Sequence, residues 1–160
     1  MKQYILDQKN VLPSLIKNRT CYEVLNNLKQ VQKIVIAASG SSKNVAMVVQ
    51  ALLSKDVEVI VDTPFQLIHN SCHIQRCDCL IAISQTGKST GTLNCAKLAN
   101  ENHIPTIAIT ADTQSPLAKE CSYIFDIHCL DETIGPKTKG YTATLLVLFF
   151  VIAQLIHKDI

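Results

Sequence analysis

The side chains best suited to binding chemistry cluster in a short stretch from Ser84 to Ser89, directly after an apolar run. This stretch carries three hydroxyl groups and the amide of Gln85, all of which can donate hydrogen bonds. Its Gly87 allows the backbone to turn sharply and to approach a ligand closely. The sequence beyond is helix-like, and the first turn of a helix offers unpaired N–H groups and a positive dipole end. The combination suits a phosphate group better than a metal ion.

A second stretch of the same kind lies upstream. The apolar run 34–38 is followed by Ser39 to Ser42 and then by a helix-like segment over 43–54. Two such turns in one small domain predict that a single anion is held between them. The alternative for either turn alone is that its hydroxyl groups only cap a helix. Neither glycine fingerprint of nucleotide-binding loops occurs in the chain.

The composition limits the classes of partner. A chain of 160 residues can bury one proper core, and its 15 basic and 13 acidic residues are scattered along the sequence. With no Trp, four Tyr and four Phe, it also has few side chains for stacking on bases. We therefore expect no nucleic-acid partner.

The cysteines and the apolar segments indicate the cellular compartment in which the protein is expected. Seven Cys, an odd number, occur with no secretory signal over residues 1–10, which predicts free thiols in a reducing cytoplasm. The most apolar run, 142–156, contains Gln154 and is shorter than the roughly 20 residues that span a bilayer. We expect a buried helix there and no membrane association.

Apolar spacing predicts strands that alternate with helices. Residues 1–30 are expected to form helices, at 4–17 and 20–30, that pack on a domain comprising 31–160. The strands are predicted at 33–38, 57–61, 79–84, 105–110 and 123–127. The remaining helices are predicted at 43–54, 63–73, 90–102, 115–120 and 139–157.

This alternation is typical of a three-layer α/β/α domain, doubly wound around a five-stranded parallel sheet. In the flavodoxin-like strand order 2-1-3-4-5, ligands bind where the winding reverses, between strands one and three at their carboxyl ends. The two hydroxyl-rich turns follow those strands. The order therefore predicts that 39–42 and 84–89 are neighbours across one crevice.

Together with the run from Thr138 to Thr144 at the start of the last helix, these turns resemble the sugar isomerase (SIS) domain family. The likeness covers about 31–156. Within the family it is to the first SIS domain of tandem proteins related to glutamine–fructose-6-phosphate aminotransferase and the fructosamine-phosphate deglycases. It implies a hexose or amino-sugar phosphate in the crevice. The matching phosphosugar-binding positions are Ser41, Ser42, Ser84, Gln85, Thr86 and Ser89.

The chain departs from the family pattern in charge and in length. Lys88 stands where aminotransferase-type sequences carry Glu, and Lys137 where they carry Ser. The first interpretation is that both lysines simply point into water, as most lysines do; the alternative is a substrate with an extra acidic group. Tandem relatives carry aldose–ketose chemistry on a second SIS domain, whereas this chain has one. We expect a second SIS domain or a homodimer partner, and we predict that it covers the outer face of the last helix, which is apolar throughout 145–152.

Aldose–ketose interconversion needs a base that moves a proton between adjacent carbons. The candidate is Glu132, which the resemblance matches to the family's acidic residue upstream of the Thr-Lys motif; the five histidines are alternatives. His69 and His73 are predicted to share a helix face. The cysteines close to these two histidines in the sequence would suggest a zinc site, but no C-x-x-C spacing occurs. We therefore expect no metal and no cofactor. The sequence favours part of a sugar-phosphate isomerase or deglycase; a non-catalytic phosphosugar sensor and a dimerisation module stay open.

Overall fold

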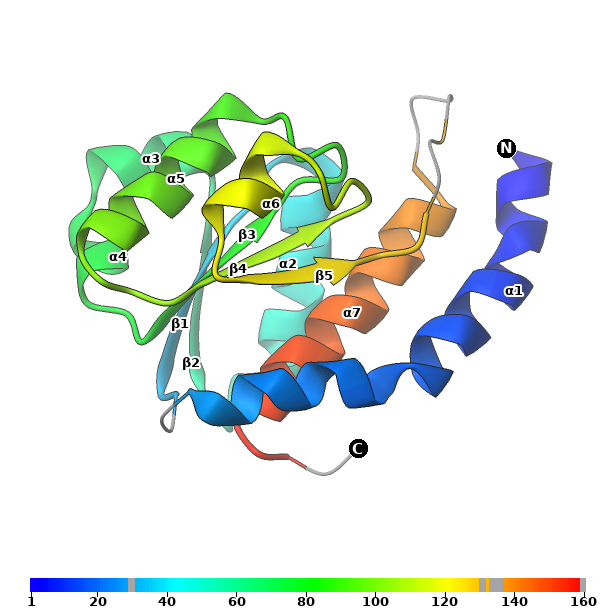
Figure 1. Cartoon of the computed structure of the whole chain (residues 1–160), viewed down its shortest axis with the longest axis horizontal. Helices are drawn as coiled ribbons and strands as arrows, with labels where there is room; N and C mark the ends of the chain where they lie inside the picture. Colours follow the sequence, from blue (N-terminus) through cyan, green and yellow to red (C-terminus); the bar gives the residue numbers. More distant parts are fainter. Residues whose placement is uncertain (29–30, 130–131, 133–136, 159–160) are drawn as a thin grey trace.

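The computed structural model describes residues 1–28, 31–129, 132 and 137–158. Within them, five parallel strands form one sheet in the order β2-β1-β3-β4-β5, which confirms the predicted order (Figure 1). The strands are β1 (Lys33–Ala37), β2 (Glu58–Asp62), β3 (Cys79–Ile83), β4 (Thr106–Thr110) and β5 (Tyr123–Asp126). Every residue of β3 and β4 is buried, as expected for parallel strands that are covered on both faces.

Helices cover both faces of this sheet, which makes three layers (Figure 1). One face carries α2 (Gly40–Leu53) and α7 (Lys139–Leu155). The other carries α3 (Pro64–His69), α4 (Cys72–Gln75), α5 (Thr90–Glu101) and α6 (Pro116–Glu120). Side chains of a strand alternate between the two cores: Ile34 and Ile36 of β1 belong to the α2/α7 core, whereas Val35 and Ala37 belong to the α5 core.

The N-terminal segment packs outside α7. Helix α1 (Lys2–Lys17) and the 3-10 helix η1 (Arg19–Asn27) both contact α7 (Figure 1). Tyr22 is 3% exposed. The centroid of its ring lies 4.9 Å from that of Phe125 and 5.5 Å from that of Phe150. The chain itself therefore supplies cover for α7 that we had expected from a second subunit or domain.

Three local predictions are wrong. Helix α2 begins at Gly40, because Ser39 takes the extended backbone of an N-cap, so Ser41 and Ser42 lie in the first turn of a helix instead of a loop. The predicted helix 63–73 is interrupted at Asn70 (φ −117°, ψ 61°). His69 therefore ends α3 and His73 lies in α4, and the two do not share the face of one helix. The predicted helix 20–30 is a 3-10 helix over 19–27, and 29–30 lie outside the described residues.

Within the described part of the chain, no helix has both the length and the apolar character needed to cross a bilayer.

Candidate functional site

The two hydroxyl-rich turns begin side by side at the carboxyl ends of β1 and β3. Ala37 pairs with Ala82 in the sheet, so the chain leaves both strands at the same level. A narrow cavity of about 10 Å³ is lined by Ser41 and Ser42 of the first turn and by Gln85 of the second. The crevice predicted between the turns is therefore present, although its free volume is that of roughly one water molecule.

The start of α7 forms the third wall of this cavity. Residues that line it there are Lys137, Gly140, Tyr141 and Thr144, with Val45 of α2 behind them. None of these five is among the predicted phosphosugar-binding positions, although Lys137 departs from the family pattern in charge. The sequence signal that could have found most of them is the Thr138–Thr144 run, which was identified as a motif but was not placed in the crevice.

Local packing determines the shape of the second turn. The carbonyl of Gln85 accepts hydrogen bonds from Ala111 N (2.9 Å) and Thr110 Oγ1 (3.2 Å), which attach the turn to the end of β4. Gly87 has φ +63°, and a Cβ there would lie 1.9 Å from Ser115 Oγ. Only glycine fits this position, because a side chain would be both strained and overlapped.

Two hydroxyl groups of this turn also stabilise local structure. Ser89 is the N-cap of α5, and its Oγ accepts hydrogen bonds from Thr92 N (3.4 Å) and Thr92 Oγ1 (2.9 Å). Thr86 Oγ1 accepts from Lys88 N at 3.4 Å. Ser84 is 8% exposed. These three hydroxyls do not line the small cavity, so the turn reaches it through Gln85.

The first turn is held by an ion pair. Lys43 Nζ lies 3.1 Å from Asp62 Oδ1, which links the start of α2 to the end of β2. The same carboxylate oxygen accepts from Thr63 N at 2.8 Å. Ser41 is exposed and Ser42 is half-buried, so both hydroxyls are within reach of a ligand.

Glu132 caps the start of α7. Its carboxylate accepts hydrogen bonds from Thr138 Oγ1 (2.9 Å), Lys139 N (2.9 Å), Gly140 N (3.2 Å) and Thr138 N (3.2 Å). The residue is only 4% exposed. Burial opposes ionisation, but the hydrogen bonds from the Thr138 hydroxyl and from the three backbone N–H groups outweigh it and lower the pKa of Glu132. The carboxylate is therefore ionised, with its acceptor sites engaged by the helix terminus.

Gly140 connects this cap to the second turn. A Cβ at Gly140 would lie 2.8 Å from Gln85 Nε2 and 3.0 Å from Glu132 Oε2. The Gln85 side chain thus packs directly against the start of α7. The N-terminal segment secures the same region, because buried Lys139 forms an ion pair of 2.7 Å with Asp7 of α1.

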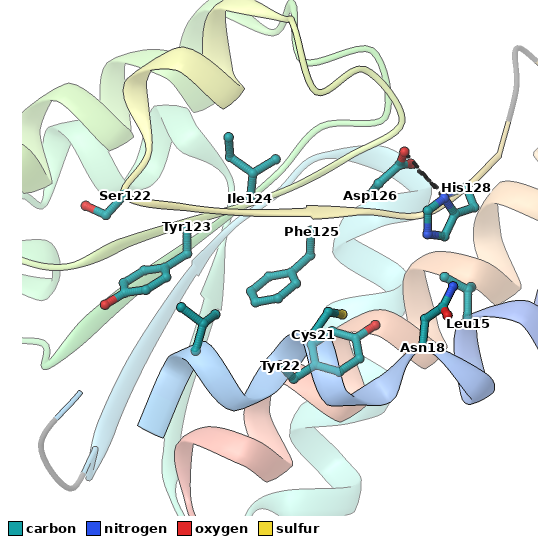
Figure 2. Close-up of a pocket in the computed structure, with 11 residues that line it drawn as sticks. Leu15, Asn18, Cys21, Tyr22, Ser122, Tyr123, Ile124, Phe125, Asp126 and His128 are labelled. Atoms are coloured by element: carbon teal, nitrogen blue, oxygen red, sulfur yellow. Dashed lines mark hydrogen bonds and ion pairs between the residues drawn. The ribbon is translucent and has the colours of Figure 1, made fainter. Parts of the chain in front are cut away.

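A larger groove of about 460 Å³ lies elsewhere, between η1 and β5. Figure 2 shows Phe125 pointing from β5 toward Tyr22 of η1, with Tyr123 on the same side of the strand. At one end His128 Nδ1 lies 3.5 Å from Asp126 Oδ2. The lining of this groove is mostly apolar and lacks the converging hydrogen-bond donors of the two turns. His128, one of the candidate bases, therefore lies in a different cavity from Ser42 and Gln85.

Comparisons with known proteins agree with this architecture. The family model described as SIS domain matches residues 27–154. The chain belongs to the SIS domain family. The SIS match spans all five strands and the cavity between the turns.

Relatives of this SIS domain are longer proteins. A Streptococcus agalactiae protein named glutamine–fructose-6-phosphate aminotransferase (isomerizing) is 26% identical over 135 residues, which is 81% of this chain and 22% of the relative. A candidate phosphosugar isomerase from Clostridium difficile 630 has a TM-score of 0.82 at 25% identity, over 98% of this chain and 45% of that one. The Vibrio vulnificus NanR protein, solved with ManNAc-6P, has the same fold, with a TM-score of 0.72 at 19% identity over 98% of this chain and 60% of that one.

Proposed function

We propose that this SIS domain binds a hexose or amino-sugar phosphate in the crevice between β1 and β3, as part of a sugar-phosphate isomerase or a fructosamine-phosphate deglycase. The observation that carries the proposal is the single cavity lined by Ser41 and Ser42 from one turn and by Gln85 from the other. The phosphate is assigned to the turn from Ser84 to Ser89, where the first turn of α5 favours an anion. The NanR protein, which shares the fold, is a complex with ManNAc-6P, and this supports the class of ligand.

Catalysis needs a base from outside this cavity or a rearrangement within it. Among the described residues, no His, Asp or Glu lines the cavity, and the carboxylate of Glu132 is engaged as a helix cap. We therefore assign the proton transfer to a site completed by a second SIS domain or by a second copy of the chain in a homodimer. We assign Glu132 itself a positioning role, because it holds the start of α7 against Gln85.

The same observation favours a second candidate function, a non-catalytic phosphosugar-sensing domain. A cavity with hydrogen-bond donors and, among its described residues, no carboxylate or imidazole is suited to binding a sugar phosphate without converting it. The unpaired state of all seven cysteines is compatible with the reducing cytoplasm in which either function would operate.

Titration calorimetry with fructose 6-phosphate and glucosamine 6-phosphate tests the proposal. We expect binding to the wild-type chain and a loss of about tenfold in affinity for Ser42→Ala and for Gln85→Ala, since each removes a hydrogen bond to the ligand. Ser14→Ala, on the exposed side of α1, is the matched control. Equal affinity in all four proteins would refute the site. Conversion of bound sugar phosphate, followed by NMR, separates the enzyme from the sensor.

A further inference from the structure

Lys137 is a cationic side chain on the wall of the cavity that the two turns share. It lines this cavity together with Ser41, Ser42 and Gln85, and it is half-buried. Among the described residues that line the cavity, only Lys137 is charged. A ligand that enters there meets one ammonium group.

The charge of Lys137 is compensated differently from that of the neighbouring lysines. Lys43 is paired with Asp62 at 3.1 Å, and Lys139 is paired with Asp7 at 2.7 Å. Lys137 Nζ instead donates a hydrogen bond of 2.7 Å to the backbone carbonyl of Glu132. Within the described residues it forms no ion pair with a carboxylate. An ammonium group has three donors, and one carbonyl satisfies only one of them.

Lys137 lies shortly before α7, which packs with α2 on one face of the sheet, whereas α5 packs on the other face (Figure 1). The start of α5 approaches α3, since a Cβ at Gly91 would lie 3.0 Å from Pro64. A phosphate held by the hydroxyls of Ser84, Thr86 and Ser89 would lie outside the cavity that Lys137 lines, because none of the three lines it. Gln85 connects the two regions, since it lies in the turn and lines the cavity.

Because the cavity is small, Lys137 must exchange its present hydrogen bond for one to the ligand, and this exchange makes it selective among ligands. The free space of the cavity is about 10 Å³, so a sugar enters only if the long side chains of Lys137 and Gln85 move. Lys137 then loses its hydrogen bond to the Glu132 carbonyl. A carboxylate on the ligand replaces that bond by one between two ionised groups and adds the attraction of opposite charges, whereas a hydroxyl only restores a bond in which the ammonium is the one ionised partner.

We propose that Lys137 is a specificity residue that binds a carboxylate at the end of the sugar remote from the phosphate, so that the preferred ligand is a phosphorylated sugar acid. The inference rests on the proposed phosphosugar site and names its substrate class. It predicts discrimination between ligands that share the phosphate and differ only in that terminal group.

The test compares 6-phosphogluconate with glucitol 6-phosphate. Both are open six-carbon chains with the same phosphate, and they differ in having a carboxylate or a hydroxymethyl group at C1. By titration calorimetry we expect the wild-type chain to bind 6-phosphogluconate about tenfold more tightly. Lys137→Gln should bring this ratio to about one by weakening the binding of 6-phosphogluconate, and Lys137→Arg should keep the preference. Lys97→Gln, which removes an exposed charge on α5, is the control.

Each outcome decides the proposal. A wild-type ratio near one, or a preference that survives Lys137→Gln, overturns the role of Lys137 and leaves the phosphosugar site intact. Failure of the wild-type chain to bind either ligand, while it binds fructose 6-phosphate, overturns the role of Lys137 alone, and failure to bind all three overturns both proposals. The wild-type preference must also shrink as the salt concentration rises, because salt screens a partly exposed ion pair, and this readout needs no variant. A preference that does not change with salt contradicts the proposal.

Discussion

Replacing Glu132 by Gln should destabilise the fold and should loosen the start of α7. The carboxylate accepts from the Thr138 hydroxyl and from the N–H groups of Thr138, Lys139 and Gly140. A glutamine keeps one acceptor oxygen and turns an NH₂ donor toward groups that are themselves donors. The loss of a charged hydrogen bond costs roughly 1.5–3 kcal/mol, and the loss of a negative charge at a helix N-terminus adds up to about 1 kcal/mol.

We therefore expect the free energy of unfolding at neutral pH to fall by about 2–4 kcal/mol in Glu132→Gln. For a domain of this size the melting temperature should fall by roughly 5–15 °C. The assay is urea and thermal unfolding followed by circular dichroism. Glu23→Gln, an exposed carboxylate on η1, is the matched control and should change the stability by less than about 0.5 kcal/mol.

The direction of the pKa shift of Glu132 determines how the stability of the fold depends on pH. The folded-state pKa of Glu132 lies below its ordinary value of 4.5, because the hydrogen bonds outweigh the opposing effect of burial. The stabilisation from the ionised carboxylate is therefore fully present above pH 4.5 and is lost as the pH falls through the folded-state pKa. The stability gap between wild type and Glu132→Gln should be largest near neutral pH and should narrow in acid.

Two results would refute this reasoning. One is equal stability of wild type and Glu132→Gln at neutral pH, and the other is a gap that stays constant when the pH falls below 4.5. If Glu132 were instead the base of aldose–ketose interconversion, the variant would lose turnover with little change in stability. Measuring both quantities on the same protein separates a positioning residue from a catalytic one.

Further predictions concern two glycines, one ion pair and the cysteines. Gly87→Ala should cost about 2–5 kcal/mol in urea unfolding, because its Cβ would lie 1.9 Å from a buried serine oxygen. Gly40→Ala has a similar positive φ of +56° but open space around it, and should cost only about 1–2 kcal/mol. Asp7→Asn should lower the melting temperature, because it leaves Lys139, whose side chain is 7% exposed, without its carboxylate. Cys21 should react with a thiol reagent before the five buried cysteines, because its side chain is exposed and theirs are inaccessible; desolvation raises the pKa of Cys21 as it does theirs, so accessibility decides the order.

The sheet and the meeting of the two turns could be predicted from the sequence because they depend on local patterns. Unbroken apolar runs such as 79–83 are typical of parallel strands, and alternation with helices leaves few allowed strand orders. Once the order is known, the turns after β1 and β3 must be neighbours. The first residue of α2 could not be predicted in the same way, since Ser39 and Ser42 are equally good N-cap residues by type. Only the backbone conformation shows that Ser39 is the N-cap.

Only the tertiary structure decided which residues far apart in the chain are in contact. No local pattern brings Asp7 to Lys139, 132 positions away, or places η1 and α1 over an apolar helix that seemed to need a partner. The role of Glu132 is of the same kind. By type the residue could be a base, and its sequence only places it upstream of a helix. Four hydrogen-bond donors gathered around a buried carboxylate make it a cap, because the geometry of its neighbours determines whether a carboxylate has an acceptor site free for a proton.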